Sequence, residues 1–238
     1  MPYGDKLFQR LSTAKRDELD EVLLALRLDP KKYERAADRD VVVEISRRLR
    51  SAAGHSVRNV FRDVHDLPYK KILIDVADKL APGRGWTSFN IDGPESEEQI
   101  EDYIEDRVRA RYRDHIERLP PNERAKVQAA LEEDLRKRGV PQNIISSVSA
   151  GLATGVLGGG ILGPAVASAL FAGFWTWLVG LSLTELLLGG LLAGGPVGGA
   201  LAGLTLLTAT SYSKTIPTVV RLVYIRRSRE AEEELGSS

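Results

Sequence analysis

Apolar residues recur every three or four positions along the first 140 residues, which is the spacing of one face of an α-helix. The clearest stripe follows Pro68, a residue that suits the first turn of a helix. Its members are Tyr69, Ile72, Leu73, Val76 and Leu80. Helices are predicted over residues 12–29, 40–54, 55–67, 68–80 and 96–119, and from a cap at Asn122 onwards. Ser96 and Gln99 have the spacing of a capping box, and the part up to residue 138 is predicted to be an autonomous bundle.

The pattern changes abruptly after residue 138. Residues 143–213, called the apolar segment below, contain a single charged residue, Glu185. A helix that spans a bilayer needs about 20 mostly apolar residues. The best candidates are residues 164–184 and 186–207, so the length of the segment allows two spans, or three or four shorter ones. The alternative is that the segment forms the buried core of a soluble helical protein.

Glycine and proline divide the apolar segment into two similar halves. Residues 157–173 align with residues 188–203, and each half contains a Gly-Pro pair. Proline disfavours helix in the residue before it, so each half predicts helix, break, helix. The two pairs are Gly163–Pro164 and Gly195–Pro196. Glycines four residues apart predict two faces for close helix packing, Gly151, Gly155 and Gly159 in one half and Gly195, Gly199 and Gly203 in the other.

Charges that flank the apolar segment predict its orientation. Positive residues lie before and after it, namely Arg136, Lys137, Arg138, Lys214, Arg221, Arg226 and Arg227. Positive flanks favour the cytoplasmic face, so both termini are expected in the cytoplasm, at the inner membrane, with an even number of crossings or a re-entrant hairpin. Trp175 and Trp177 would form an interfacial belt, or else pack in a core. Glu185 would lie at a turn or in a polar cavity, or, in a soluble core, pair with Lys214 or Arg221.

Composition narrows the chemistry. The chain has 33 basic and 33 acidic residues, without the basic excess typical of nucleic-acid binders, so no nucleic-acid partner is expected. It has no cysteine, which removes disulfides and thiol catalysis. The residues up to about position 21 lack the apolar run of a secretory signal.

No catalytic, metal or cofactor site is predicted. The three histidines, at positions 55, 65 and 115, lack the spacing of metal ligands on one helix. No arrangement of nucleophile and base can be read from the order of residues. Gly158, Gly160 and Gly163 satisfy GxGxxG, but no strand-like run precedes them, so no nucleotide cofactor is expected.

Three stretches resemble a known family. Residues 17–29, 69–80 and 194–227 are similar to the uncharacterised bacterial YaaW-type family. That family is grouped loosely with ubiquinol–cytochrome c chaperones. The resemblance implies an assembly-chaperone role only through this grouping, and it implies no catalytic residue.

The sequence therefore predicts an all-α protein made of a charged helical bundle and a Gly-rich apolar module of helical hairpins. The predicted boundaries are 1–138 for the bundle, 139–227 for the module and 228–238 for a charged tail. We expect a membrane-associated protein that perturbs or permeabilises the bilayer, with the bilayer, further copies of itself and an unidentified protein as partners. The alternatives are a soluble scaffold or assembly chaperone in the cytoplasm and, with least support, an enzyme.

Overall fold

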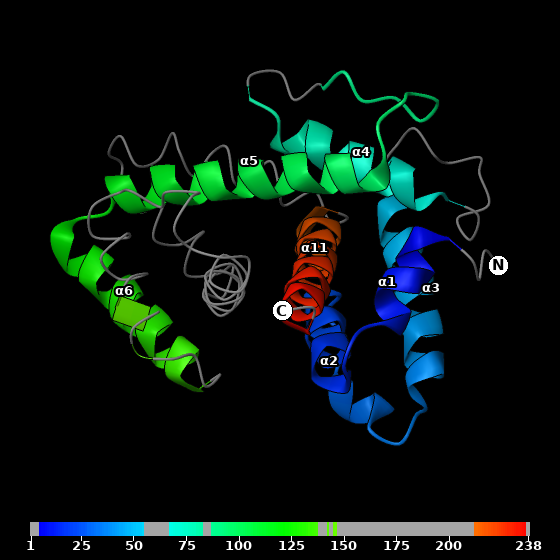
Figure 1. Cartoon of the computed structure of the whole chain (residues 1–238), viewed down its shortest axis with the longest axis horizontal. Coiled ribbons are helices and arrows are strands. Elements are labelled where there is room, and N and C mark those ends of the chain that lie inside the picture. The colour runs from blue at the N-terminus through cyan, green and yellow to red at the C-terminus, as the bar shows by residue number, and fades with distance from the viewer. Residues whose placement is uncertain are drawn as a thin grey trace. The chain divides into compact units, whose positions relative to one another are not determined.

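The structure, a computed structural model, describes residues 5–54, 67–82, 87–137, 142, 145–146 and 212–236. Every regular element in these ranges is a helix, which confirms the all-α class. The elements are α1 (Lys6–Ser12), α2 (Arg16–Ala25), the 3₁₀ turn η1 (Pro30–Tyr33), α3 (Asp38–Gly54), α4 (Tyr69–Leu80), α5 (Glu97–Arg118), α6 (Pro121–Lys137) and α11 (Tyr212–Gly236). Figure 1 shows their course. The predicted helix over residues 55–67 lies outside the described ranges except for Leu67.

The predicted hairpin module lies almost entirely outside the described residues. This holds for Arg138 and for the glycines, prolines, tryptophans and glutamate on which its interpretation depends. Those residues are Gly151, Gly155, Gly159, Gly163, Pro164, Trp175, Trp177, Glu185, Gly195, Pro196, Gly199 and Gly203. In the part of the chain that the structure describes, no helix combines the length and the apolar character of a membrane span.

The chain divides into two compact units. The first unit contains the described residues up to Val108 together with Tyr212–Ile225. The second contains the described residues from Arg109 to position 146 and those from Arg226 onwards. Helix α11 itself is continuous across position 227, which is the predicted end of the apolar module. Ion pairs one helical turn apart support this continuation: Arg226 and Arg227 each pair with Glu230 at 3.0 Å.

The core of the first unit joins residues from both ends of the chain. Helices α1 and α2 both pack on α3, and the ion pair of Arg221 with Glu21 joins α11 to α2. The predicted stripes of α3 and α4 are buried, as expected. The largest side chains withdrawn from water come from five helices, and they are Leu7, Leu11, Leu19, Leu23, Ile45, Leu49, Tyr69, Ile72, Leu73, Ile100 and Ile104.

Helix α11 is enclosed by the first unit. Thr218, Val219, Val220, Leu222 and Val223 are all at most 1% exposed. Successive residues of an α-helix point about 100° apart, so a run like this is covered on every side. A surface helix would bury one stripe and expose the opposite face. This part of α11 is thus an interior element of the unit that also contains α2, to which it is joined by the ion pair of Arg221 with Glu21.

Two helix starts differ from their predictions. The helix expected from Ser12 starts later, as α2 at Arg16, and a short helix that was not predicted, α1, ends at Ser12. The Asp5 carboxylate accepts the Phe8 amide at 3.1 Å and caps α1. Helix α6 starts at Pro121, one residue before the predicted cap Asn122, since proline suits the first helical position. The capping box of α5 is confirmed: Ser96 N–H donates to Gln99 Oε1 at 2.8 Å, and Gln99 N–H donates to Ser96 Oγ at 3.3 Å.

Candidate functional site

The candidate site is the place where the chain returns from the apolar segment to the first unit. Tyr212 is the first residue of α11, and the Lys79 ammonium lies 5.1 Å from the centre of its ring. A cation over an aromatic face contributes about 0.5–1 kcal/mol at exposed sites. The contact joins the start of α11 to the end of α4. We call the surface of α2 and α4 that carries Glu21 and Lys79 the α11 docking site.

The second contact of the docking site is an ion pair. Arg221 Nη1 lies 2.8 Å from Glu21 Oε2, and the two side chains are 8% and 28% exposed. Removing one partner of a buried pair costs about 3–5 kcal/mol, because the other charge is left without compensation. The neighbours of Arg221 along α11, Val220 and Leu222, are both fully buried. The ion pair therefore fixes the rotation of α11 against α2.

A proline lies between these two contacts. Pro217 has no amide hydrogen, so the helical bond to the carbonyl of residue 213 is not made. The next residue adds a bond of its own: the Thr218 hydroxyl donates to the Lys214 carbonyl at 2.8 Å. Helices bend at such positions. The first turn of α11 can therefore differ in direction from the enclosed part that follows it.

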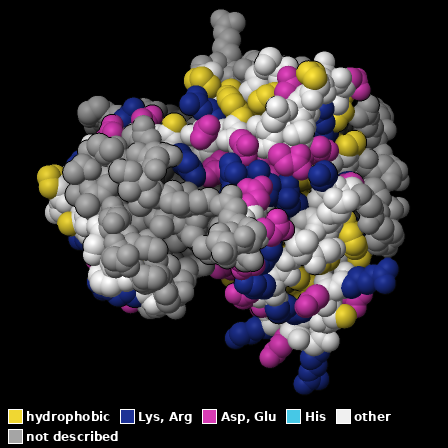
Figure 2. Space-filling view, in the orientation of Figure 1, with side chains coloured by type: hydrophobic (Ala, Val, Ile, Leu, Met, Phe, Trp, Pro, Cys, Tyr) yellow, Lys and Arg dark blue, Asp and Glu magenta, His cyan; other side chains and the backbone are white. Residues whose placement is uncertain are grey.

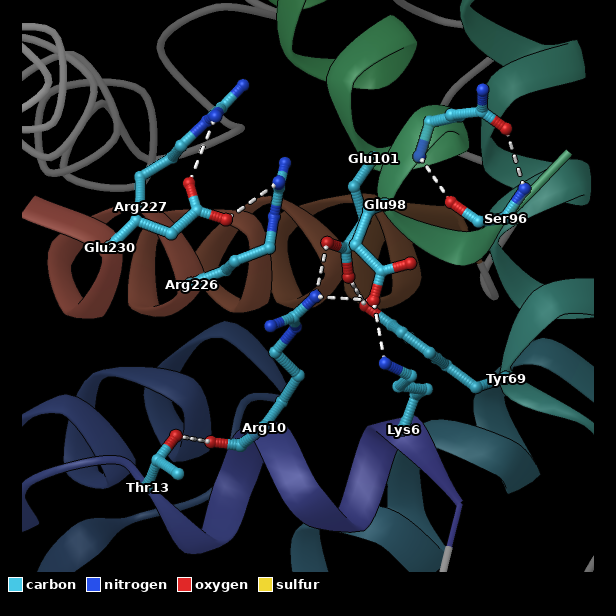
Figure 3. Close-up of polar contacts among 11 residues, drawn as sticks. Lys6, Arg10, Thr13, Tyr69, Ser96, Glu98, Glu101, Arg226, Arg227 and Glu230 are labelled. Atoms are coloured by element: carbon cyan, nitrogen blue, oxygen red, sulfur yellow. Dashed lines mark hydrogen bonds and ion pairs between the residues drawn. The ribbon is translucent and has the colours of Figure 1, made fainter. Parts of the chain in front are cut away.

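A second polar cluster joins α1 to α4 and α5 within the first unit (Figure 3). Glu98 of α5 lies 3.0 Å from Lys6 Nζ and 3.4 Å from Arg10 Nη2. Arg10 also reaches Glu101 Oε2 at 3.1 Å, and the Tyr69 hydroxyl donates to Glu101 Oε1 at 2.8 Å. Glu101 is fully buried, so these bonds satisfy a carboxylate that water does not reach.

The electrostatics of the cluster favour charged carboxylates. Burial opposes the ionisation of Glu98. Bonds from Lys6, from its own backbone amide and from Ser96, together with the Lys6 charge, outweigh burial and lower the pKa of Glu98 to about 2. The position of Glu98 in the first turn of α5 also suits a negative charge.

A buried arginine also binds the N-terminal end of α1. Arg50 of α3 is 2% exposed and forms an ion pair with Asp5, the cap of α1. It also donates to the Leu67 carbonyl just before α4. One guanidinium thereby links three segments of the first unit. The cluster and this arginine form a structural network, since each group bonds to a partner within the protein.

Four of the predicted orientation charges form ion pairs within the protein. Arg221 pairs with Glu21, and Arg136 lies 3.6 Å from Glu132 Oε2. Arg226, only 5% exposed, and Arg227 both pair with Glu230. Lys214 is partly exposed. Glu185, the expected partner of Lys214 or Arg221 in a soluble core, lies outside the described residues, so that pairing stays a prediction.

Several of these contacts were not predicted from the sequence. Tyr69 was identified only as a member of an apolar stripe, although its hydroxyl bonds to Glu101. Glu21 and Glu101 look like ordinary charges on helix faces, and no spacing marks them as partners of distant arginines. Helix α1 does leave a signal, because Asp5 followed by Leu7 and Leu11 is a cap followed by two residues one turn apart.

The described residues contain no group of three or more histidine, aspartate or glutamate side chains placed to hold a metal ion. Acidic and basic side chains lie interspersed on the face of the molecule shown in Figure 2. Comparison of the chain with models of protein families, with curated proteins and with solved structures finds no match. The resemblance to the YaaW-type family therefore stays a prediction.

Proposed function

We propose that this chain is a membrane-associated protein whose apolar segment enters the bilayer and returns, so that its helical domain lies wholly on one side. The observation that carries the proposal is the burial of α11 in the first unit. Helices α1 to α4 precede the apolar segment and α11 follows it, yet they share one core. A folded unit with ion pairs and charged surfaces does not straddle a bilayer, where unpaired polar groups are costly.

This topology constrains the number of crossings. The chain leaves the first unit after Val108, and Tyr212, beyond the apolar segment, belongs to the first unit again. Its path through the bilayer therefore has an even number of crossings or is a re-entrant hairpin. The argument does not depend on the flanking charges, several of which are paired within the protein. It agrees with the two-span interpretation of residues 164–184 and 186–207.

The glycine faces give the segment a mode of packing. In lipid, helices associate through close backbone contact at small residues, since the hydrophobic effect does not drive them together. Gly151, Gly155 and Gly159 would form one such face, and Gly195, Gly199 and Gly203 the other. Packing of these faces within and between copies would build an oligomer that perturbs or permeabilises the bilayer.

The soluble alternative is a scaffold or assembly chaperone that buries the apolar segment itself. It needs amphipathic helices with apolar faces to spare. Helices α1 and α2 both pack on α3, and the stripe of α4 is buried. The two functions differ in what covers the apolar segment, lipid or protein, and the fractionation below distinguishes them.

The test combines fractionation with labelling. The native chain has no cysteine, so a single one can be introduced at an exposed position on each side of the apolar segment, by Ile91→Cys and by Glu233→Cys. Both variants should sediment with membranes and resist carbonate extraction. An impermeant maleimide should label both from the same side of sealed vesicles. Labelling from opposite faces would contradict the even number of crossings, and a full chain that stays soluble and monomeric without detergent would contradict membrane association.

A further inference from the structure

The start of α11 indicates which part of the first unit lies nearest the bilayer. The second of the two proposed spans ends at Leu207, and Tyr212 follows it by five residues. Five residues cover about 8 Å as a helix and at most about 18 Å when fully extended. The headgroup layer on each side of a bilayer is about 5–8 Å thick. In the proposed topology Tyr212 therefore lies in the headgroup layer or close outside it.

The contact of Tyr212 with α4 brings the end of that helix to the same depth. The Lys79 ammonium lies 5.1 Å from the centre of the Tyr212 ring. Leu80 is the last residue of α4, and Pro82, two residues later, is exposed. Both segments belong to the first unit. We call the end of α4 and the first turn of α11, with Lys79, Tyr212 and Lys214, the exit surface.

The side chains of the exit surface are of the kinds found at membrane interfaces. Tyr212 is half-buried, and tyrosine is enriched at headgroup depth because its ring is apolar and its hydroxyl is polar. Lys79 and Lys214 are both partly exposed. A lysine at this depth can lay its apolar stem along the interface and place its ammonium against lipid phosphate.

The acidic side chains near this surface are bonded within the protein. Burial and, after it, the charges of Asp75 and Asp78 raise the pKa of Tyr212, so both carboxylates lie near its ring. Asp75 forms an ion pair with Lys71 at 2.7 Å, and Asp78 accepts the backbone amide of Thr87 at 2.7 Å. Carboxylates bonded in this way repel an approaching phosphate less than unbonded ones would.

We propose that the exit surface lies against the lipid headgroups, with Tyr212 in the interfacial layer and Lys79 and Lys214 against lipid phosphates. This inference rests on the proposed membrane function and adds which face of the first unit meets the bilayer. Helix α2 then lies farther from the lipid, because it is paired to α11 at Arg221. That residue is nine positions beyond Tyr212, about 14 Å along the helix.

Fluorescence quenching locates the face that meets the lipid. The native chain has no cysteine, so Pro82→Cys in the full-length protein carries a single environment-sensitive dye beside the exit surface. The matched control is Leu24→Cys, at an exposed position of α2. In phosphatidylcholine vesicles that carry a spin label on the headgroup, we expect the dye to be quenched at position 82 and the quenching to be lost at position 24. Equal quenching at both positions, or stronger quenching at position 24, would overturn the inference.

Charge reversal tests the two lysines. Lys79→Glu together with Lys214→Glu, in the Pro82→Cys protein, puts carboxylates opposite the phosphates and should remove most of the quenching at position 82. Lys32→Glu, at an exposed position of η1, should leave it unchanged. Unchanged quenching in the double variant would overturn the phosphate contact. A protein that resists carbonate extraction but shows no quenching at position 82 would overturn this inference alone, whereas a protein that carbonate extracts would overturn the proposed function as well.

Discussion

Glu101 is a charged residue held in a place that water does not reach, and its partners determine whether it stabilises or destabilises the protein. A buried carboxylate without partners would cost several kcal/mol. Here the Tyr69 hydroxyl and the Arg10 guanidinium bond to its two oxygens at 2.8 and 3.1 Å. The same Arg10 reaches Glu98, so the loss of one member weakens the rest. Arg221 and Arg50 are likewise buried charges with a partner: Arg221 pairs with Glu21, and Arg50 pairs with Asp5.

Removing the Tyr69 hydroxyl should destabilise the protein although the ring stays in place. Tyr69→Phe keeps the apolar stripe of α4 but leaves one oxygen of a buried carboxylate without its donor. Hydrogen bonds to charged groups contribute about 1.5–3 kcal/mol. We expect a fall of that size in the free energy of unfolding, measured by urea denaturation. The matched control is Tyr103→Phe, which keeps the edge-on contact of that ring with Phe89; an equal loss in both variants would remove the role of the Glu101 bond.

The low pKa of Glu98 predicts how stability depends on pH. Its pKa is about 2 in the folded state and 4.5 in the unfolded chain. The unfolded state therefore binds a proton more readily, so the contribution of Glu98 is fully present above about pH 4.5 and is lost as pH falls towards 2. Glu98→Gln should flatten the decline in unfolding free energy between pH 5 and pH 3. Asp92→Asn, at an exposed turn, is the control, and a Glu98→Gln curve that parallels the parent over this range would contradict the assignment.

At the scale of elements, periodicity predicted the helices whose apolar stripes face one core. Helices α3 and α4 begin and end close to their expected positions because spacing, caps and proline all indicate the same boundaries. Helix α1 was not predicted because it is only two turns long, whereas Ser12 and Thr13 offered a plausible cap for the helix that starts at Arg16. The sequence places residues up to 227 in the apolar module, because Ile216, Val219, Val220 and Val223 continue directly from the apolar segment. Hydropathy reports that a residue is buried, but only the long-range contact of Arg221 with Glu21 identifies where.

The candidate site could not be predicted from the sequence, because its contacts join residues far apart in the chain. Each of its contacts joins two ordinary residues, such as a lysine of α4 and a tyrosine of α11, through a fold that brings distant segments together. The positive residues that flank the apolar segment predict its orientation in a membrane, but their spacing does not indicate ion-pair partners. Their partners on α2 and within α11 could not be deduced from spacing, because Glu21 stands among several acidic residues of similar character.

At the scale of the whole molecule, the apolar segment interrupts a domain rather than following one. The caps and apolar stripes of residues 1–138 predict that this part folds alone, and that stays a prediction. The burial of α11 leads us to expect the opposite, since a fragment that ends at residue 138 lacks an interior helix. The first unit then cannot complete its core until α11, which follows the apolar segment, has been synthesised.

Deleting the apolar segment while keeping α11 should therefore give a stable soluble domain. The variant joins residue 138 to residue 212 through about 20 Gly and Ser residues, a flexible connection with a root-mean-square span of roughly 25 Å. We expect it to purify without detergent and to melt cooperatively by circular dichroism, because α11 restores the contacts with Glu21 and Lys79. Residues 1–138 alone should bind a hydrophobic dye and melt over a broad range. Arg221→Glu in the linked variant should lower its Tm, whereas a 1–138 fragment that melts as sharply and as high as the linked variant would mean that α11 is dispensable to the core.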